Sequence, residues 1–325
     1  MSDKVFNCPI LFLIFNRPDT TQKVFNQIKK IKPKKLYIAS DGPRQNNPDD
    51  IEKCKETIEI IDQIDWDCDI ETLLREENLG CKKAISSAIT WFFENEESGI
   101  ILEDDCVPID SFFWFCQELL DKYKYDEKVM MISGLNYFNN KLEMKESYFF
   151  SNYVIIWGWA TWRRAWKKYN INMDGWIEFD NKKYLSYIYN NRKFEKWLYS
   201  LFKVAYENKV DAWGIQWYFS ILINDGLCIV PKYNLVTNIG VEGAHVSEKS
   251  KIHFMPTKPL NVNGIIHPKL ILLDYKYNNM LVNKVVQGFP NPKIRKLKDL
   301  FIRITRIPNK LKKLLINKQK NINFL

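Results

Sequence analysis

The sequence predicts an α/β fold in which a mostly parallel sheet is covered by helices on both faces. Two observations support this class. Short continuous apolar runs alternate with amphipathic stretches of helical length over the first hundred residues, and a polar cluster follows each of four apolar runs. The chain has 325 residues, of which 46% are hydrophobic and 27% charged, so it can bury a large core. A disordered or fibrous protein is excluded.

The first strand is predicted at Cys8 to Phe15, because an uninterrupted apolar run bounded by prolines is typical of a buried parallel strand. A helix follows it and ends before Pro33. Further strands are expected at 35–40, 69–74, 99–102 and 129–133. Helices are expected near 49–64, 81–94, 112–123 and 194–208, with a tryptophan-dense turn and helix over 155–169 and a last helix from Asp211 that Gly226 caps.

Cysteine and histidine usage limits the possible metal chemistry. The seven cysteines are scattered, odd in number and form no C-x-x-C pair, which argues against a disulfide framework and against a zinc ribbon. Three histidines are too few and too spread for a histidine cage. We therefore expect any metal to be held mainly by carboxylates.

The net charge of +9 resides in the C-terminal segment. Residues 293–325 contain eleven Lys or Arg and one acid, Asp299, whereas residues 1–292 are nearly neutral. Apolar residues recur there every three to four positions, as in a cationic amphipathic helix pair, so we expect this tail to bind an anionic membrane surface. Packing of the tail on the body is an alternative. Nucleic-acid binding is not expected, because the body has no recognised nucleic-acid motif.

No apolar run is long enough to span a membrane, and no cleavable leader is recognisable. We expect a cytoplasmic protein that is peripheral at the inner face of the cytoplasmic membrane.

Polar residues follow four of the predicted strands: Asn16-Arg17, Asp41, Arg75 to Asn78, and Glu103-Asp104-Asp105. Because sites in parallel sheets lie at the carboxyl ends of the strands, we expect these clusters to converge at one edge. Three consecutive acids after an apolar strand favour a hard divalent cation with oxygen ligands. The alternative is a solvated acidic loop.

These motifs, together with Ser40-Asp41-Gly42, Arg75-Glu76-Glu77-Asn78-Leu79-Gly80 and Gly158-Trp159, resemble in order and spacing those of glycosyltransferases of the GT-A fold. The similarity is greatest to bacterial members related to N-acetylglucosaminyltransferase I, whose metal motif is also Glu-Asp-Asp. The resemblance covers residues 8–247. It implies a catalytic domain at 1–250, with a nucleotide-binding half at 1–107 and an acceptor half at 108–250. A connecting segment at 251–292 and the tail at 293–325 follow.

The resemblance also implies roles on the donor side. Arg17 and Asp41 would hold the uracil and ribose end of a nucleotide, where Asp41 would accept a base N–H. Asp105 would bind Mn²⁺ or Mg²⁺ at the donor diphosphate. Glu103 and Asp104 would contact the ribose or metal-bound waters. The remaining nucleotide-lining positions are Arg75, Asn78 and Gly80, with phosphate favoured at the start of the following helix.

An inverting transferase needs a carboxylate that takes the proton of the acceptor hydroxyl. Our candidate is Asp211, and its alternative role is a plain helix N-cap. This chain has Gly214 where relatives often place an acid, so Glu242 and Asp174 are kept as reserve candidates. The glycine-rich loop 238–245 resembles a lid, and we expect its His245 to join Asp105 at the metal and diphosphate.

On the acceptor side, flat aromatic faces next to Gly158 suggest that Trp157 and Trp159 bind sugar rings, with Gln216 beside them. Trp162 and Trp166 have helical i,i+4 spacing, which favours the core.

The expected function is an inverting, metal-dependent transfer of a hexose or N-acetylhexosamine from a nucleotide diphosphate, with UDP expected, to a bacterial surface polysaccharide or lipid-linked oligosaccharide. Two alternatives remain. One is an inactive module of the same fold that binds glycans or nucleotides, and the other is a sugar nucleotidyltransferase.

Overall fold

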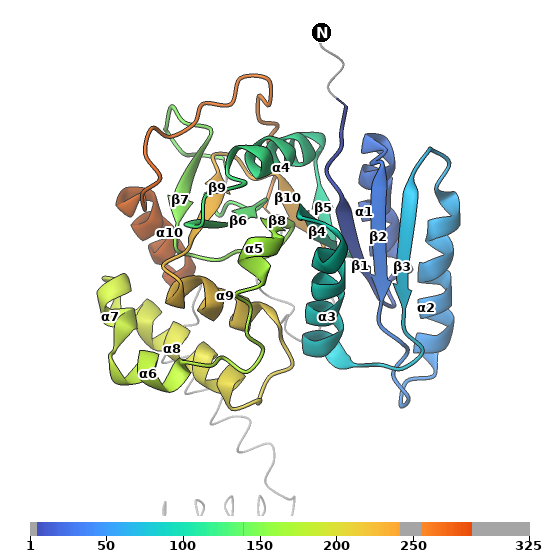
Figure 1. Cartoon of the computed structure of the whole chain (residues 1–325), viewed down its shortest axis with the longest axis horizontal. Coiled ribbons are helices and arrows are strands. Elements are labelled where there is room, and N and C mark those ends of the chain that lie inside the picture. Colours follow the sequence, from blue (N-terminus) through green and yellow to red (C-terminus); the bar gives the residue numbers. More distant parts are fainter. Residues whose placement is uncertain (1–4, 139, 241–254, 288–325) are drawn as a thin grey trace, which may run out of the picture. The chain divides into compact units, whose positions relative to one another are not determined.

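A computed structural model describes residues 5–138, 140–240 and 255–287 of the chain. The chain divides into two compact units, Met1–Val286 and Gln287–Leu325, and the description below concerns the first. Its centre is an eight-stranded sheet with the order β3-β2-β1-β4-β8-β6-β9-β7, beside a two-stranded sheet of β5 and β10 (Figure 1). The sequence-based prediction of an α/β fold built on a largely parallel sheet is confirmed.

Four parallel strands form one half of the large sheet. They are β1 (Ile10–Ile14), β2 (Lys35–Ser40), β3 (Asp69–Leu74) and β4 (Ser98–Glu103). In register, Leu13 of β1 lies opposite Ala39 of β2 and Glu103 of β4, so these strands end side by side. All four were predicted from the sequence within two residues at each end.

Helices cover both faces of this half. Ile10, Phe12 and Ile14 face the core that is shared with α1 (Pro18–Ile31) and α4 (Asp110–Lys122). On the opposite face, Tyr37 of β2 packs edge-on against Trp91 and Phe92 of α3 (Gly80–Asn95). Because both faces of β1, β2 and β4 are covered, these strands are nearly continuous apolar runs in the sequence, whereas the residues of the edge strand β3 are mostly exposed. Helix α2 (Asp49–Glu59) continues into a short 3-10 helix at Ile60–Gln63.

The other half of the large sheet is mixed and was only partly predicted. Strand β8 lies between β4 and β6 and is antiparallel to both, whereas β9 is parallel to β6. The strands are β6 (Val129–Ser133), β7 (Tyr148–Ser151), β8 (Trp159–Trp162) and β9 (Leu227–Pro231). The small sheet pairs β5 (Cys106–Pro108) with β10 (Val236–Asn238).

The prediction of a turn and helix over 155–169 was wrong at its centre. Residues 159–162 form β8, and the helix α5 is only Arg163–Trp166. All four residues of β8 are buried, because helices and neighbouring strands cover the strand on both sides. Aromatic and β-branched residues suit such a strand, and this tertiary burial overrides the helical spacing of Trp162 and Trp166.

The helix that we expected to begin at Asp211 begins later than predicted. Helix α9 is Gly214–Ile223, and Asp225 rather than Gly226 adopts the left-handed backbone conformation after it, with φ 50°. A Cβ at Gly226 would lie 2.4 Å from the Met130 sulfur and 3.0 Å from the Ile221 carbonyl oxygen, so a larger residue there would have to shift the Met130 side chain. The remaining helices are α6 (Trp176–Asn181), α7 (Tyr184–Ile188), α8 (Arg192–Tyr206) and α10 (Tyr275–Gln287).

Residues 255–286 belong to the first compact unit, although we expected a connecting segment at 251–292. Tyr277 of α10 packs with Phe149 of β7 and Val230 of β9, so this helix completes a small second core. The tail at 293–325 lies outside the described residues. Among the helices that are described, none is long and apolar enough to cross a membrane.

Candidate functional site

The acidic triplet lies where β4 ends. Glu103 is the last residue of β4, and Asp104 and Asp105 follow in the turn that leads to β5. Asp104 is buried, whereas the Asp105 side chain keeps 14% of its surface exposed. The triplet is therefore a partly enclosed cluster of carboxyl groups and not a solvated loop.

Arg17 binds two carboxyl groups of the triplet. Its Nη1 lies 2.8 Å from Asp105 Oδ2, and its other guanidinium nitrogens donate to both oxygens of Asp104. Arg17 stands between β1 and α1, and because β1 pairs with β4, the two strand ends bring these side chains together. The convergence of the first and fourth polar clusters is confirmed.

Burial and mutual repulsion shape the ionisation of the triplet. Burial raises the pKa of Glu103, and the charges of Asp105 and Asp104 raise it further. Burial also raises the pKa of Asp104, although Arg17 opposes this change. For Arg17, burial acts to lower the pKa, but the two carboxylates outweigh it and raise the pKa. Arg17 thus binds two carboxylates with one positive charge, which leaves a surplus of negative charge for a further cation.

The start of the glycine-rich loop lies against Asp105. The Ile239 amide donates to the Asp105 carbonyl oxygen at 2.8 Å, and Asn238 Nδ2 lies 3.3 Å from Asp105 Oδ1. A Cβ at Gly240 would come within 2.3 Å of Asp105 Oδ2 and 3.3 Å of Arg17 Nη1. Only a glycine allows the backbone to approach the ion pair this closely. His245 and Glu242 follow in this loop, and both lie outside the described residues.

A metal ion would find suitable donor atoms here but not a complete set. Carboxylate oxygens are the ligands that Mn²⁺ and Mg²⁺ prefer, and Asp105 is the accessible one of the pair that Arg17 holds. In the described part of the chain, however, no three His, Cys, Asp or Glu side chains converge to hold a metal ion. The remaining ligands would have to come from a bound phosphate, from water or from the loop that continues past Gly240.

Asp41 anchors the turn before α3. Its carboxylate accepts the amide N–H groups of Gly42, Leu79 and Gly80 at 3.0 to 3.2 Å, and the Nδ2 of Asn78 at 3.0 Å. Burial raises the pKa of Asp41, while these hydrogen bonds oppose the change. The oxygens that we expected to receive a base N–H are therefore engaged within the chain.

Asp211 caps α3 from a distant part of the sequence. Its two oxygens accept the N–H groups of Cys81 and Lys82 at 2.8 Å each. It does not cap α9, which begins three residues later with Trp213 as N-cap. The alternative role of a plain N-cap is thus correct in kind, but the helix that is capped is α3.

Together Asp41 and Asp211 use the four consecutive N–H groups from Leu79 to Lys82. Our expectation that phosphate binds these amides is not met, because two carboxylates already occupy them. Gly80 makes the arrangement possible: its φ is +78°, and a Cβ would lie 2.7 Å from Asp211 Oδ2.

The thiol of Cys81 lies near the acidic triplet as well as near Asp41 and Asp211. Burial raises the pKa of the Cys81 thiol to about 12, and the charges of Glu103, Asp211 and Asp41 contribute. Arg75 lies on the Asp41 side, where it donates to Ser87 Oγ at 2.9 Å, and burial lowers its pKa. All the predicted donor-side residues that are described therefore lie at one sheet edge.

The acceptor-side prediction fails for Trp159. This side chain is fully buried in β8 and stacks on Trp213 at a ring distance of 5.5 Å, so it cannot meet a sugar. Gln216 is also fully buried, and neither atom of its amide has a hydrogen-bond partner among the described residues. Trp157 is half-buried and packs near Tyr137, which leaves it as the accessible member of the three.

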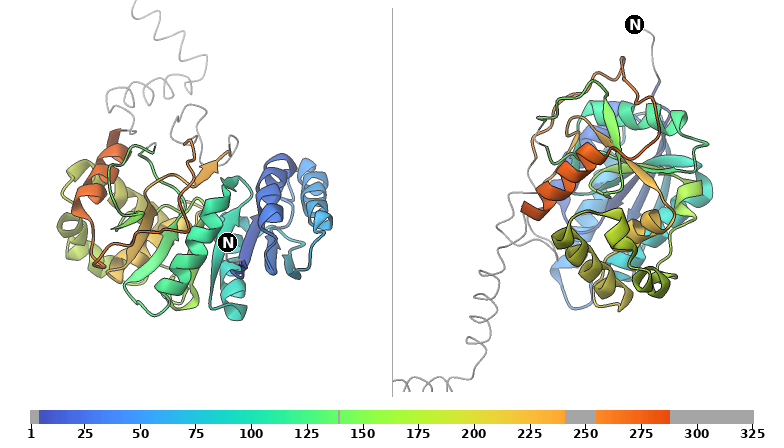
Figure 2. Two further views of the ribbon diagram at one scale, coloured as in Figure 1. Left: turned by 90° about the horizontal axis from the view of Figure 1, so that it is seen from above. Right: turned by 90° about the vertical axis from the view of Figure 1, so that its left-hand side faces the viewer.

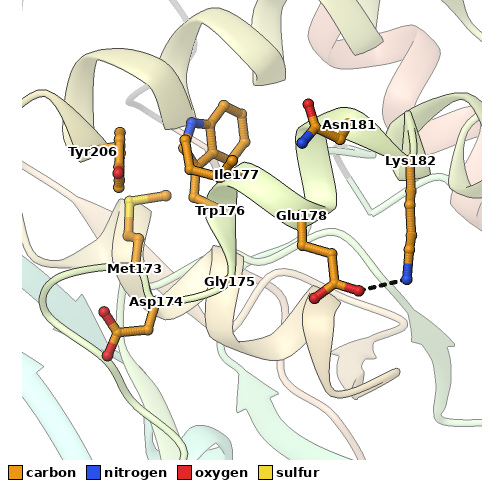
Figure 3. Close-up of a pocket in the computed structure, with 9 residues that line it drawn as sticks. All are labelled: Met173, Asp174, Gly175, Trp176, Ile177, Glu178, Asn181, Lys182 and Tyr206. Carbon is orange, nitrogen blue, oxygen red and sulfur yellow. Dashed lines mark hydrogen bonds and ion pairs between the residues drawn. The ribbon is translucent and has the colours of Figure 1, made fainter.

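Asp174, a reserve base, lines a separate hollow of about 600 Å³ near α6 and α8. Figure 3 shows Trp176 and Tyr206 on one side of it and the Glu178–Lys182 ion pair on the other. None of the strand-end residues lines this hollow.

One pair of residues escaped the sequence analysis. Asp50 is buried and binds Arg44 and Asn16, and Arg44 lowers the pKa of Asp50 to about 2. This ion pair fixes the loop after β2 beside the β1 end. The acids at the start of α2 were the available signal, but acids are common in a first helical turn.

No protein-family profile matches the chain, and no curated protein matches it significantly.

Proposed function

We propose that the chain is a metal-dependent glycosyltransferase of the GT-A type that transfers a hexose or N-acetylhexosamine, with inversion, from a nucleotide diphosphate to a glycan hydroxyl. The proposed nucleotide is UDP, and the proposed acceptor is a bacterial surface polysaccharide or lipid-linked oligosaccharide. The observation that carries the proposal is the meeting of Arg17, Asp104 and Asp105 with the Gly240 backbone where β1 and β4 end.

The charge balance of this site supports a metal-dependent donor. A nucleoside diphosphate is anionic, and the triplet keeps a negative surplus after Arg17 is counted, so the two would repel each other. A divalent cation between them removes the repulsion. Asp105 would hold Mn²⁺ or Mg²⁺ together with donor oxygens, and His245 of the adjoining loop is proposed as a further ligand. When bound, the metal would stabilise the charge on the leaving diphosphate.

The chain's own residues have distinct proposed roles. Arg17 holds Asp104 and Asp105 in place, so the carboxylates need little reorganisation when a ligand binds. Glu103 and Asp104 are proposed to contact the ribose or metal-bound water. Arg75 and Asn78 are proposed to line the nucleotide, because both lie beside Asp41.

Asp211 is kept as the proposed base. Asp211 is exposed. Each of its oxygens accepts one amide N–H and retains a second lone pair, which could accept a hydrogen bond from the acceptor hydroxyl. In the same step the anomeric carbon loses its bond to the diphosphate oxygen and gains a bond to the acceptor oxygen, and Asp211 takes the acceptor's proton.

A second candidate function rests on one observation. Because Asp211 serves as the cap of α3 and position 214 is a glycine, the chain could bind a nucleotide or glycan without catalysing transfer. An acid at 214 would also have to displace Ile156, whose Cδ1 would lie 2.4 Å from the new Cβ.

Thermal stabilisation tests the donor site without knowledge of the acceptor. The protein is titrated with UDP, GDP, CDP and TDP, each with and without Mn²⁺, since a ligand of the native state raises the melting temperature. We expect a shift with UDP that requires the metal and is lost in Asp105→Ala. Asp62→Ala, an exposed acid on another part of the surface, is the matched control. No shift with any nucleotide would refute the donor site.

Product analysis then separates the candidate functions. Release of UDP and formation of a glycosidic bond support the transferase. Binding without turnover on any glycan pool supports the inactive module, and release of pyrophosphate would indicate a nucleotidyltransferase.

A further inference from the structure

A row of exposed apolar side chains lies beside β7, the edge strand at the opposite end of the sheet order from β3. We call it the apolar strip. Its members are more than half exposed: Ile266 (55%), Leu270 (67%), Leu272 (58%) and Tyr275 (70%). Four large exposed apolar side chains within ten residues form a patch, and exposed apolar patches mark interaction sites more often than single exposed apolar residues do.

Alternation of burial explains why these side chains face outward. Ile271 and Leu273 pack on the main core, whereas Leu270 and Leu272 are exposed. The alternation of exposure shows that Leu270 and Leu272 are turned away from the core on which Ile271 and Leu273 pack.

Hydrogen bonds hold both ends of this segment on the body. The Ile266 carbonyl accepts from the Ser147 amide at 2.8 Å, and the Asp274 amide donates to the Phe150 carbonyl at 2.9 Å. Between them, His267 Nδ1 lies 3.0 Å from the Tyr148 hydroxyl. The strip is thus presented on a fixed support. The path of residues 255–274 over the β7 side, and α10 after it, can be followed in Figure 2.

The exposed charged side chains of residues 266–276 are positive, whereas Glu118 of α4 lies close enough to His267 to interact with it electrostatically. Lys269 is exposed between its members, and Lys276 follows its last member. The single acid of residues 255–287, Asp274, uses its carboxylate to accept the Tyr277 amide at 3.0 Å. Other exposed apolar residues have acidic neighbours: Ile51 lies among Asp49, Asp50 and Glu52, and Ile177 precedes Glu178.

We propose that the apolar strip inserts into the headgroup region of an anionic phospholipid bilayer. Apolar tips interleaved with lysines suit such a surface, where both the hydrophobic effect and the surface charge contribute. The chain then continues from α10 into the segment that carries eleven Lys or Arg. A two-fold contact of the strip with a second copy would instead bring lysines together. The proposal does not rest on the glycosyl transfer.

Hydrogen exchange on the full-length protein tests this assignment. The protein is mixed with vesicles of phosphatidylcholine containing phosphatidylglycerol, or of phosphatidylcholine alone. We expect slower amide exchange over 266–276 with the anionic vesicles only, and no change over 49–56. Binding with protection confined to 288–325 would overturn the proposal, as would the absence of vesicle binding.

Matched variants add a quantitative test by vesicle flotation. Leu270→Gln/Leu272→Gln is expected to reduce partitioning onto anionic vesicles about tenfold with an unchanged melting temperature, since both side chains are exposed. Ile51→Gln should leave partitioning unchanged. Lys269→Gln/Lys276→Gln is expected to lose about fivefold per lysine at low salt. Unchanged partitioning of the leucine variant, or a concentration-dependent dimer that this variant abolishes, would refute the proposal.

Discussion

Two groups of carboxylates lie at the same edge of the sheet, and they differ in what binds their oxygens. In the acidic triplet, Asp104 and Asp105 share the guanidinium of Arg17, so negative charge is left over. Asp41 and Asp211 instead accept the four amides that open α3. The first group retains capacity for a cation, whereas the second serves mainly to fix the backbone of the site.

The largest expected effect comes from Asp105, because it belongs to the group with surplus charge. Asp105→Asn should lower metal-dependent transfer roughly a thousandfold, since it removes the proposed metal ligand. Chelation of the metal by EDTA should have the same effect on the wild-type protein. Turnover is measured with UDP-sugars at saturating Mn²⁺. Asp62→Asn is the control, and an Asp105→Asn protein that retains full turnover would contradict the mechanism.

Asp211→Asn separates capping from catalysis. Asparagine has one acceptor oxygen and can keep only one of the two amide hydrogen bonds of Asp211, so the free energy of unfolding should fall by about 1 kcal/mol. Loss of a general base should lower kcat at least about a hundredfold while donor affinity is kept. Denaturant unfolding and steady-state kinetics measure the two effects. An unchanged kcat would leave Asp211 as a cap alone and move the base elsewhere.

Gly80→Ala tests the amide clamp directly. The left-handed backbone and the contact with Asp211 Oδ2 should together cost about 2 kcal/mol of unfolding free energy. Gly175→Ala is a matched control, because its φ is +89° but a Cβ there meets nothing within 4 Å. It should lose only the backbone contribution, about 1 kcal/mol. Equal losses in the two variants would show that the contact with Asp211 contributes nothing to stability.

Glu103→Gln should stabilise the protein slightly. Burial, with the charges of Asp105 and Asp104, raises the pKa of Glu103, so the folded state binds this proton more tightly than the unfolded chain. The cost of the charged carboxylate is absent below the unfolded pKa and develops as the pH rises through the raised folded pKa. The variant should therefore gain about 1 kcal/mol at about pH 8 and little at about pH 4.

Asp50→Asn should change the pH dependence of the unfolding free energy in the opposite direction. Because Arg44 lowers the pKa of Asp50 to about 2, the stabilisation it gives is present above the unfolded pKa and is lost as the pH falls through the folded pKa. Thermal unfolding across pH measures both variants, and an equal pH dependence in the two would refute the difference between their surroundings.

The sequence by itself determined the parallel half of the sheet and the edge where the site lies. Period and composition suffice there, because β1, β2 and β4 are buried apolar runs, β3 is bounded by turn residues, and parallel strands end together. Thus Arg17, Asp41, Asn78 and the triplet were placed correctly from local patterns. The mixed half was harder to predict. The spacing of Trp162 and Trp166 fits a helix, and only the pairing of β8 with β4 and β6 makes residues 159–162 a strand.

Only the tertiary structure decided which partner each polar group takes. The bonds of Asp211 to Cys81 and Lys82 span about 130 residues, and no local spacing announces them. Likewise, the burial of Trp159 and Gln216 follows from the packing of β8 against α9 rather than from their neighbours in sequence. The physical reason is that local patterns report which face of an element is apolar, whereas hydrogen-bond partners depend on which elements pack together in the folded chain.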